Sequence, residues 1–410
     1  MSSNEEKKKS DYLTTVQQGC PLYGQRPDMF RLMRWNLCFA AMYRLPLERY
    51  FPACLRLLAI TLDWTYELCL YSTMLHIDIL FMYTLYLNKD KDDLELIVSC
   101  MIQTVIYTWA IVIKVFFKRV KPKRVEELMR YLNEECQTRS APGFTYVTMK
   151  ESADLANKCS AVFLIWCYAG VICWLFVPIF NQDRSLPLAC WYPIDYKVPV
   201  VYEIVYFLQT VGQLQVASAF GCSSAFYLQV SVLFSGQFDV LNCSLKNILA
   251  TTYLILRKPE SELILLREKQ NIANYELNQY YNAKEHNSDF DCIAHLVDVK
   301  TPKPKKFYEA FKIAFSPCVT QHLYILNGLK MLEELYSFLW FLKTIQVTML
   351  ICLVAFACVK RSPWYLHSSE IKQDVLFFIL NAQRPFRLTG GKMYNLNVEK
   401  FRSMDLRQPQ

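Results

Sequence analysis

The chain has 410 residues with a net charge of +8, and 53% of its residues are hydrophobic and 15% aromatic. This composition excludes the disordered class, which is poor in hydrophobic residues. Several stretches of about 20 residues are almost free of charge, the length with which a helix crosses a bilayer. The sequence therefore predicts an all-α, multi-pass membrane protein.

The N-terminal region, residues 1–62, is expected to be cytoplasmic. Its first ten residues are polar and do not resemble a cleavable signal peptide. Further along, Phe30, Met33 and Leu37 recur at helical spacing among regularly placed arginines. This pattern predicts an amphipathic helix at the inner face of the membrane.

Four spans are predicted within residues 63–241, at 64–87, 96–117, 160–180 and about 200–234. The second span ends in the strongest basic cluster of the chain, between Lys118 and Arg124. Positively charged loops stay in the cytoplasm, so this cluster and the N-terminus are predicted to lie inside. Residues 242–333 then form a polar cytoplasmic extension, and residues 334–359 hold the fifth span. Lys343 lies in this span and is expected to reach the interface rather than to serve a function.

The third span contains Trp166, Gly170 and Trp174, spaced four residues apart. They share one helix face and form an aromatic notch that suits a small volatile apolar ligand. A structural role is the alternative, because small residues also let membrane helices approach closely.

Other ligand candidates lie on the neighbouring spans. Tyr107 and Trp109 are two residues apart in the second span, so at most one of them faces a pocket. Tyr206 and Gln209 belong to a polar and aromatic stripe on the fourth span, which either contacts ligand or bonds to neighbouring helices.

No enzyme, metal or cofactor is predicted. The sequence lacks the common catalytic and phosphate-binding motifs, and the pair Cys318 and His322 supplies only two of the four ligands of a zinc site. A disulfide of Cys190 in an outer loop is a weak possibility. The basic residues 300–306 are expected to form a solvated linker, so no nucleic-acid partner is expected.

Residues 360–410 carry the most specific motifs. Trp364 is followed by Arg384 and Pro385, and then by a turn of Leu, Thr, Gly and Gly at residues 388–391. With His322 before the fifth span, these motifs resemble the signature of insect odorant receptors. Hydropathy and loop lengths are similar to that family over residues 1–359.

The resemblance implies the odorant-binding subunit of a cation channel, which works as a heterotetramer with the family's obligatory co-receptor in the plasma membrane of olfactory sensory neurons. It implies a ligand pocket among the outer halves of spans two to four and six, and a gate formed by the seventh span. Residues implied to anchor one subunit to another are His322, Trp364, Val375, Phe378, Ile379, Arg384 and Pro385.

The sequence departs from this family at its end. The family has seven spans, whereas only five are recognisable here, because Lys360 directly precedes the signature and residues 397–410 are too charged to cross a bilayer. The chain thus resembles a receptor that lacks the sixth span and the end of the seventh. Alternatives are a non-conducting truncated form, a gustatory receptor and, against the charge placement, a G-protein-coupled receptor.

Overall fold

The computed structural model describes residues 28–45, 56–88, 94–180, 185–259, 261–268, 285–287 and 306–361, with a few isolated positions beyond. The chain divides into two compact units, Met1–Leu350 and Ile351–Gln410. Among the described residues of the second unit are the end of the last long helix and the strand pair β3 (Thr389–Gly390) and β4 (Tyr394–Asn395).

Among the described residues, five helices are long and apolar enough to cross a membrane. They are α3 (Arg56–Asn88), α4 (Leu94–Val115), α6 (Met149–Phe180), α7 (Val201–Lys246) and α11 (Phe307–Arg361). Each contains one of the five predicted spans, which confirms the all-α membrane class with five recognisable spans. The boundaries of the predicted regions stay predictions, and the expectations for a sixth and seventh span fall largely outside the described residues.

Shorter elements join these helices. They are α2 (Arg31–Phe39), the π-helical turn η3 (Phe116–Val120), α5 (Pro122–Glu134), α8 (Ile248–Ile255) and the strand pair β1 (Thr145–Tyr146) and β2 (His286–Asn287). Pro122 begins α5, a position where a helix does not need the missing amide hydrogen. The π-helical turn continues α4 and carries Lys118 and Arg119.

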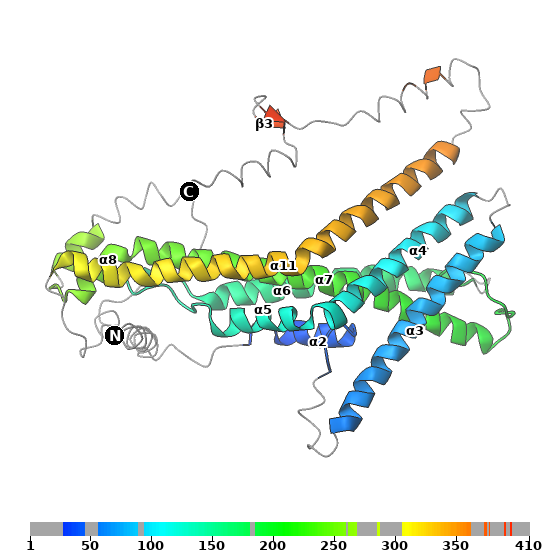
Figure 1. Ribbon diagram of the computed structural model, residues 1–410, viewed down its shortest axis with the longest axis horizontal. Helices are drawn as coiled ribbons and strands as arrows, with labels where there is room; N and C mark the ends of the chain where they lie inside the picture. The colour runs from blue at the N-terminus through cyan, green and yellow to red at the C-terminus, as the bar shows by residue number, and fades with distance from the viewer. Residues whose placement is uncertain are drawn as a thin grey trace. The chain divides into compact units, whose positions relative to one another are not determined.

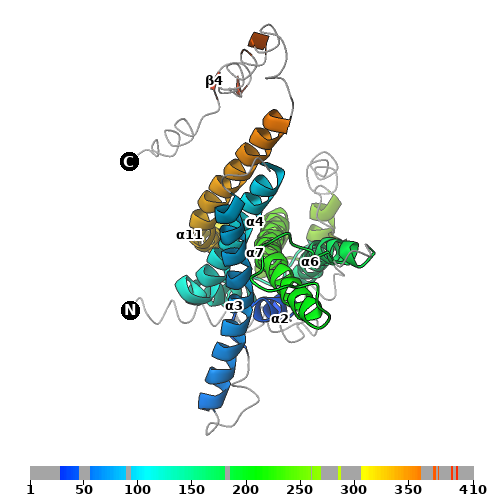
Figure 2. The same cartoon turned by 90° about the vertical axis from the view of Figure 1, so that its right-hand side faces the viewer.

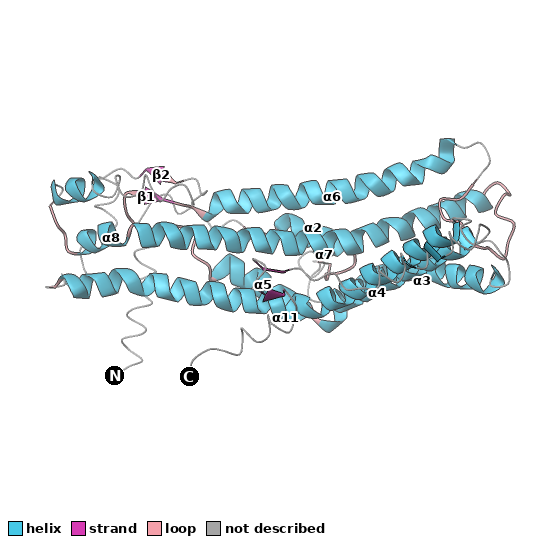
Figure 3. Cartoon of the chain, turned by 90° about the horizontal axis from the view of Figure 1, so that it is seen from above, coloured by secondary structure: helices cyan, strands magenta, loops and turns pink. Residues whose placement is uncertain are grey.

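Helix α7 is the centre of the first unit. It runs alongside α6 over much of its length, and α3 and α4 also pack on it (Figures 1 and 3). Figure 2 shows α3 and α4 beside one another. Buried residues recur along the whole of α7, which is why so long a helix is held on several sides at once.

The predicted amphipathic segment forms α2, and its apolar face lies against protein. Phe30, Met33 and Leu37 are buried, and the ring of Phe30 lies 6.0 Å from that of Phe226 in α7. The backbone oxygen of Met29 accepts a 2.7 Å hydrogen bond from the Gln229 amide. The exposed apolar residues of α2 are instead Leu32, Trp35 and Phe39, so its other side is the one open to a membrane.

Charged side chains join α3 to the π-helical turn. The Lys118 amine lies 3.1 Å from the Asp63 carboxylate, and the Arg119 guanidinium lies 2.6 Å from that of Glu67. The same guanidinium sits 3.8 Å from the ring centre of Trp64. Two cations of the predicted cytoplasmic cluster are thus neutralised within the helix bundle, which lowers the cost of burying them.

Candidate functional site

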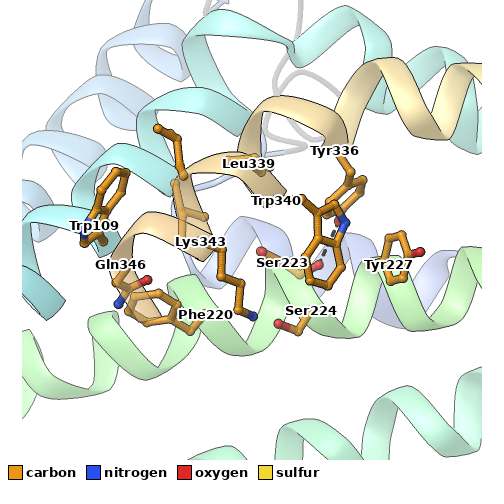
Figure 4. A pocket seen from close by; sticks show the side chains of 12 residues that line it. Trp109, Phe220, Ser223, Ser224, Tyr227, Tyr336, Leu339, Trp340, Lys343 and Gln346 are labelled. Atoms are coloured by element: carbon orange, nitrogen blue, oxygen red, sulfur yellow. Dashed lines mark hydrogen bonds between the residues drawn. The ribbon is translucent and has the colours of Figure 1, made fainter. Parts of the chain in front are cut away.

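A pocket opens where α4, α7 and α11 meet (Figure 4). It has an empty volume of about 580 Å³, including the part open to the outside. The residues that line it are Trp109, Ile113, Phe220, Ser223, Ser224, Tyr227, Tyr336, Leu339, Trp340, Leu342, Lys343 and Gln346. Its mostly apolar walls with a few polar groups are typical of a site for a small organic molecule.

Aromatic contacts hold one wall of the pocket in place. The Tyr227 ring lies 5.1 Å from that of Tyr336 and 5.3 Å from that of Trp340, both close to perpendicular. The Tyr336 hydroxyl donates a 2.7 Å hydrogen bond to the backbone oxygen of Ser223. This wall joins α7 to α11, so a molecule bound there contacts both helices.

The polar groups of the pocket are few. Ser223 and Ser224 come from α7, and Lys343 and Gln346 come from α11. Gln346 is buried, whereas Lys343 is exposed in the isolated chain. The Lys343 amine lies 5.6 Å from the ring centre of Trp340 and is directed between Phe220 and Ser224 (Figure 4).

Tyr107 and Trp109 point in different directions from α4. Trp109 lines the pocket, and Tyr107 is fully buried between α4 and α7. The Tyr107 hydroxyl donates a 2.8 Å hydrogen bond to the side-chain oxygen of Gln213. Of the two candidates, Trp109 is therefore the one placed to touch a ligand in this pocket.

The predicted notch on α6 does not contribute to this pocket. Trp166 is 76% exposed and Trp174 41% exposed, and a side chain added at Gly170 would meet nothing within 4 Å. Gly170 therefore does not serve as a close contact between helices in the isolated chain. The notch is an open aromatic surface, and its role in ligand binding stays a prediction.

Tyr206 and Gln209 hold α7 to the chain around it. The Tyr206 hydroxyl donates to the backbone oxygen of Leu175 in α6. Gln209 is fully buried and exchanges hydrogen bonds of 3.0 and 3.2 Å with the backbone of Leu188. These contacts correspond to the bonding alternative for the stripe, and neither residue lines the pocket of Figure 4.

Cys190 is a buried free thiol in the segment between α6 and α7, so the weaker alternative of a disulfide there is not found. It accepts a 3.4 Å hydrogen bond from the Gln209 amide. Burial raises the pKa of this thiol to about 11, which keeps it protonated at neutral pH. A protonated, buried thiol packs as a small apolar side chain.

Of the predicted anchor residues, only His322 lies among the residues that the structure describes. His322 lies on an exposed face of α11. The other six, Trp364, Val375, Phe378, Ile379, Arg384 and Pro385, lie outside the described residues. Within the described ranges, no three potential metal ligands among His, Cys, Asp and Glu come together.

Most residues of the pocket were not predicted from the sequence, above all those that α11 contributes. Tyr336, Trp340 and Lys343 follow one another at helical spacing, and this signal was available. Lys343 was assigned to the membrane interface, and the two aromatic residues were given no role. Phe220 and Tyr227 gave no local signal, because only the packing of α7 on α11 brings them to the pocket.

Comparison with known proteins gives consistent matches. A family model described as 7tm Odorant receptor matches residues 96–360. Odorant receptor 83a of Drosophila melanogaster is 38% identical, over 92% of this chain and 92% of its own length. Putative odorant receptor 85e of the same species is 28% identical, over 87% and 85%. Among solved structures, the insect olfactory receptor OR5 from Machilis hrabei has a TM-score of 0.42 and 15% identity, over 92% of this chain and 96% of its own.

Proposed function

Because the chain belongs to the insect odorant receptor family, we propose that it is the odorant-binding subunit of a ligand-gated cation channel formed with the family's obligatory co-receptor. Membership makes it a membrane receptor rather than an enzyme. The function that we propose is the detection of a small volatile odorant, as part of the sense of smell.

The observation that carries this proposal is the pocket between α4, α7 and α11. Its walls are mainly aromatic and aliphatic, and its polar groups are few, as expected for a site that binds small apolar molecules. It joins three membrane-length helices, so a bound ligand stabilises one arrangement of them over another. Such a difference in affinity between two arrangements is the only means by which a ligand can gate a channel.

The length of α11 supports assembly with other subunits. Its 55 residues measure roughly 80 Å at about 1.5 Å per residue, whereas a bilayer core is about 30 Å thick. The part that precedes the predicted span carries large exposed apolar side chains, including Phe315, Val319 and Leu323 beside His322. An apolar face outside the membrane suits contact with another subunit, here proposed as the anchor of a heterotetramer.

We place the receptor in the plasma membrane of olfactory sensory neurons with its N-terminus inside. The paired cations at the end of α4 and the basic residues that open α5 support this orientation. An epitope tag at Met1 is expected to be reached by antibody only after the cells are made permeable. Labelling of intact cells would overturn the orientation.

The proposal is tested by expressing the chain with the co-receptor in cells that carry a calcium indicator. We expect a panel of volatile odorants to contain at least one that evokes calcium entry, and Trp109→Ala to weaken the response. Cells that express the co-receptor alone are the control. If the complex reaches the surface and stays silent to every odorant, the non-conducting alternative replaces this proposal.

A further inference from the structure

Lys343 places a positive charge well inside a membrane-spanning helix. At about 1.5 Å per residue, the step from Leu335, where the predicted span begins, to Lys343 is roughly 12 Å. A charged side chain at such a depth is costly unless an opposite charge lies near it, and it commonly marks a functional site.

The chain supplies no anion for this lysine within its described part. None of the ion pairs among the described residues includes Lys343. The acids Asp63 and Glu67 are already paired with Lys118 and Arg119. The contact that Lys343 does make is with the face of Trp340, at 5.6 Å from the ring centre. A cation over an aromatic ring at this distance is only weakly stabilised and keeps its capacity for an anion.

The side chains around the Lys343 amine indicate which other chemical groups a ligand of this pocket carries. Figure 4 shows Lys343 directed into the pocket, with Ser224 and Gln346 on either side of it. A hydroxyl and an amide can both donate hydrogen bonds to an oxygen held near the amine. Beyond these groups the pocket is apolar, bounded by Trp109 and Phe220.

We propose that this pocket binds a small organic carboxylate, with its charged group against Lys343 and its hydrocarbon part between Trp109 and Phe220. This inference rests on the proposed odorant-binding function and adds the ligand class. Charge-assisted hydrogen bonds from an amine are about twice as strong as neutral ones, so a carboxylate gains more here than an ester of the same length. An amine ligand is repelled by Lys343.

The volume favours a free small acid over a membrane lipid. The empty space of about 580 Å³ includes the part open to the outside, so it is an upper bound on what a ligand can fill. The two acyl chains and headgroup of a phospholipid are considerably larger than such a site. The ligand is therefore a single-chain carboxylic acid of about the size of octanoic acid.

The test uses the purified full-length chain in phosphatidylcholine nanodiscs and measures equilibrium binding of octanoic acid, methyl octanoate and octylamine. We expect the acid to bind tightest to the wild type. Lys343→Met is expected to weaken acid binding by about tenfold and to leave ester binding unchanged. Lys343→Glu is expected to reverse the preference in favour of octylamine. Lys330→Met removes an exposed charge elsewhere on α11 and serves as the matched control.

Equal binding of acid and ester by the wild type, or acid binding indifferent to Lys343→Met, would overturn the carboxylate site. Loss of acid binding when phosphatidylserine is added to the nanodiscs would also overturn it, by making a lipid headgroup the occupant. If the acid binds through Lys343 but the complex with the co-receptor conducts for no odorant, the channel proposal fails and the carboxylate site stands. If other odorants open the channel and the acid does not bind, only the carboxylate site fails.

Discussion

The amine of Lys114 in α4 donates a hydrogen bond to the side-chain oxygen of Gln215 in α7, and both side chains are almost completely buried. This contact joins two of the three helices that form the pocket. The Ser218 hydroxyl donates to the Gln215 backbone oxygen at 2.8 Å and lies 3.4 Å from the same Gln215 side-chain oxygen, so its hydrogen can turn to that oxygen when the amine is removed. Removing Gln215 therefore leaves the Lys114 amine without an acceptor, whereas removing Lys114 leaves the Gln215 oxygen with Ser218 nearby.

We expect Gln215→Leu to destabilise the protein more than Lys114→Met. Gln215→Leu leaves a buried amine without its acceptor, at a cost of about 3 kcal/mol, whereas Lys114→Met leaves the Gln215 oxygen near Ser218, at a cost of about 1 kcal/mol. The measurement is the thermal unfolding midpoint of the full chain in detergent. The double variant is expected to be more stable than Gln215→Leu alone, and an equal loss in both single variants would contradict this account.

Glu67 offers a second test of buried charge. Its carboxylate is 6% exposed and lies 2.6 Å from Arg119 and 3.4 Å from Lys118. We expect Glu67→Gln to lower the free energy of unfolding by about 3 kcal/mol, because Arg119 loses its counter-charge and Lys118 keeps only Asp63. Glu127→Gln is the matched control, since Glu127 is 41% exposed in its pair with Arg124 and is expected to change stability by less than about 0.5 kcal/mol.

Added salt is expected to affect the buried ion pairs of Glu67 and the exposed ion pair of Glu127 differently. Screening weakens exposed ion pairs and leaves buried ones largely intact. The stability difference between the wild type and Glu67→Gln is therefore expected to persist in 1 M salt, a concentration at which charges are screened within about 3 Å. A difference that vanishes in salt would show that the Glu67 cluster is reached by solvent ions.

The sequence predicted the membrane helices well because their signal is local. A charge-free run of about 20 residues is sufficient to identify a span, and α3, α4, α6, α7 and α11 each contain one. It did not predict how far α7 and α11 continue, because both run on as helices into segments with charge, such as the end of α7 at Lys246. Hydropathy marks the membrane crossing and not the helix end.

The pocket was less predictable for a different reason. Trp109 and Trp340 are distant in sequence and line one cavity only because α4 and α11 pack beside α7. Helical spacing tells which residues share a face, as for Trp166 and Gly170, but not what that face meets. In the structure the Trp340 ring of α11 lies 5.3 Å from that of Tyr227 in α7, whereas Trp166 of α6 is 76% exposed.

Tyr107 and Trp109 are expected to give opposite phenotypes. Tyr107→Phe removes the hydrogen bond to Gln213 and is expected to lower stability by about 1 kcal/mol without changing the odorant concentration for half-maximal response. Trp109→Ala removes a pocket wall and is expected to raise that concentration about tenfold, with a smaller effect on folding. Calcium imaging with the co-receptor and thermal unfolding are measured on the same variants. The same phenotype for both would place the ligand elsewhere.

Gly170 and Gly328 differ in the space that their surroundings leave for a side chain. A Cβ at Gly170 meets nothing within 4 Å, so Gly170→Ala is expected to stabilise α6 by up to about 1 kcal/mol. A Cβ at Gly328 would lie 2.6 Å from the Phe234 ring and 3.0 Å from that of Tyr131, so Gly328→Ala is expected to cost about 1–3 kcal/mol. Thermal unfolding measures both changes.

The odorant response of Gly170→Ala then decides between the two surfaces. If the ligand lies between α4, α7 and α11, this variant responds at the wild-type odorant concentration, because no residue of α6 lines that pocket. If the ligand instead rests in the notch between Trp166 and Trp174, the methyl group occupies part of its volume and the response shifts to higher concentration. A shifted response in a receptor with undiminished thermal stability would move the proposed odorant site from the α11 pocket to α6.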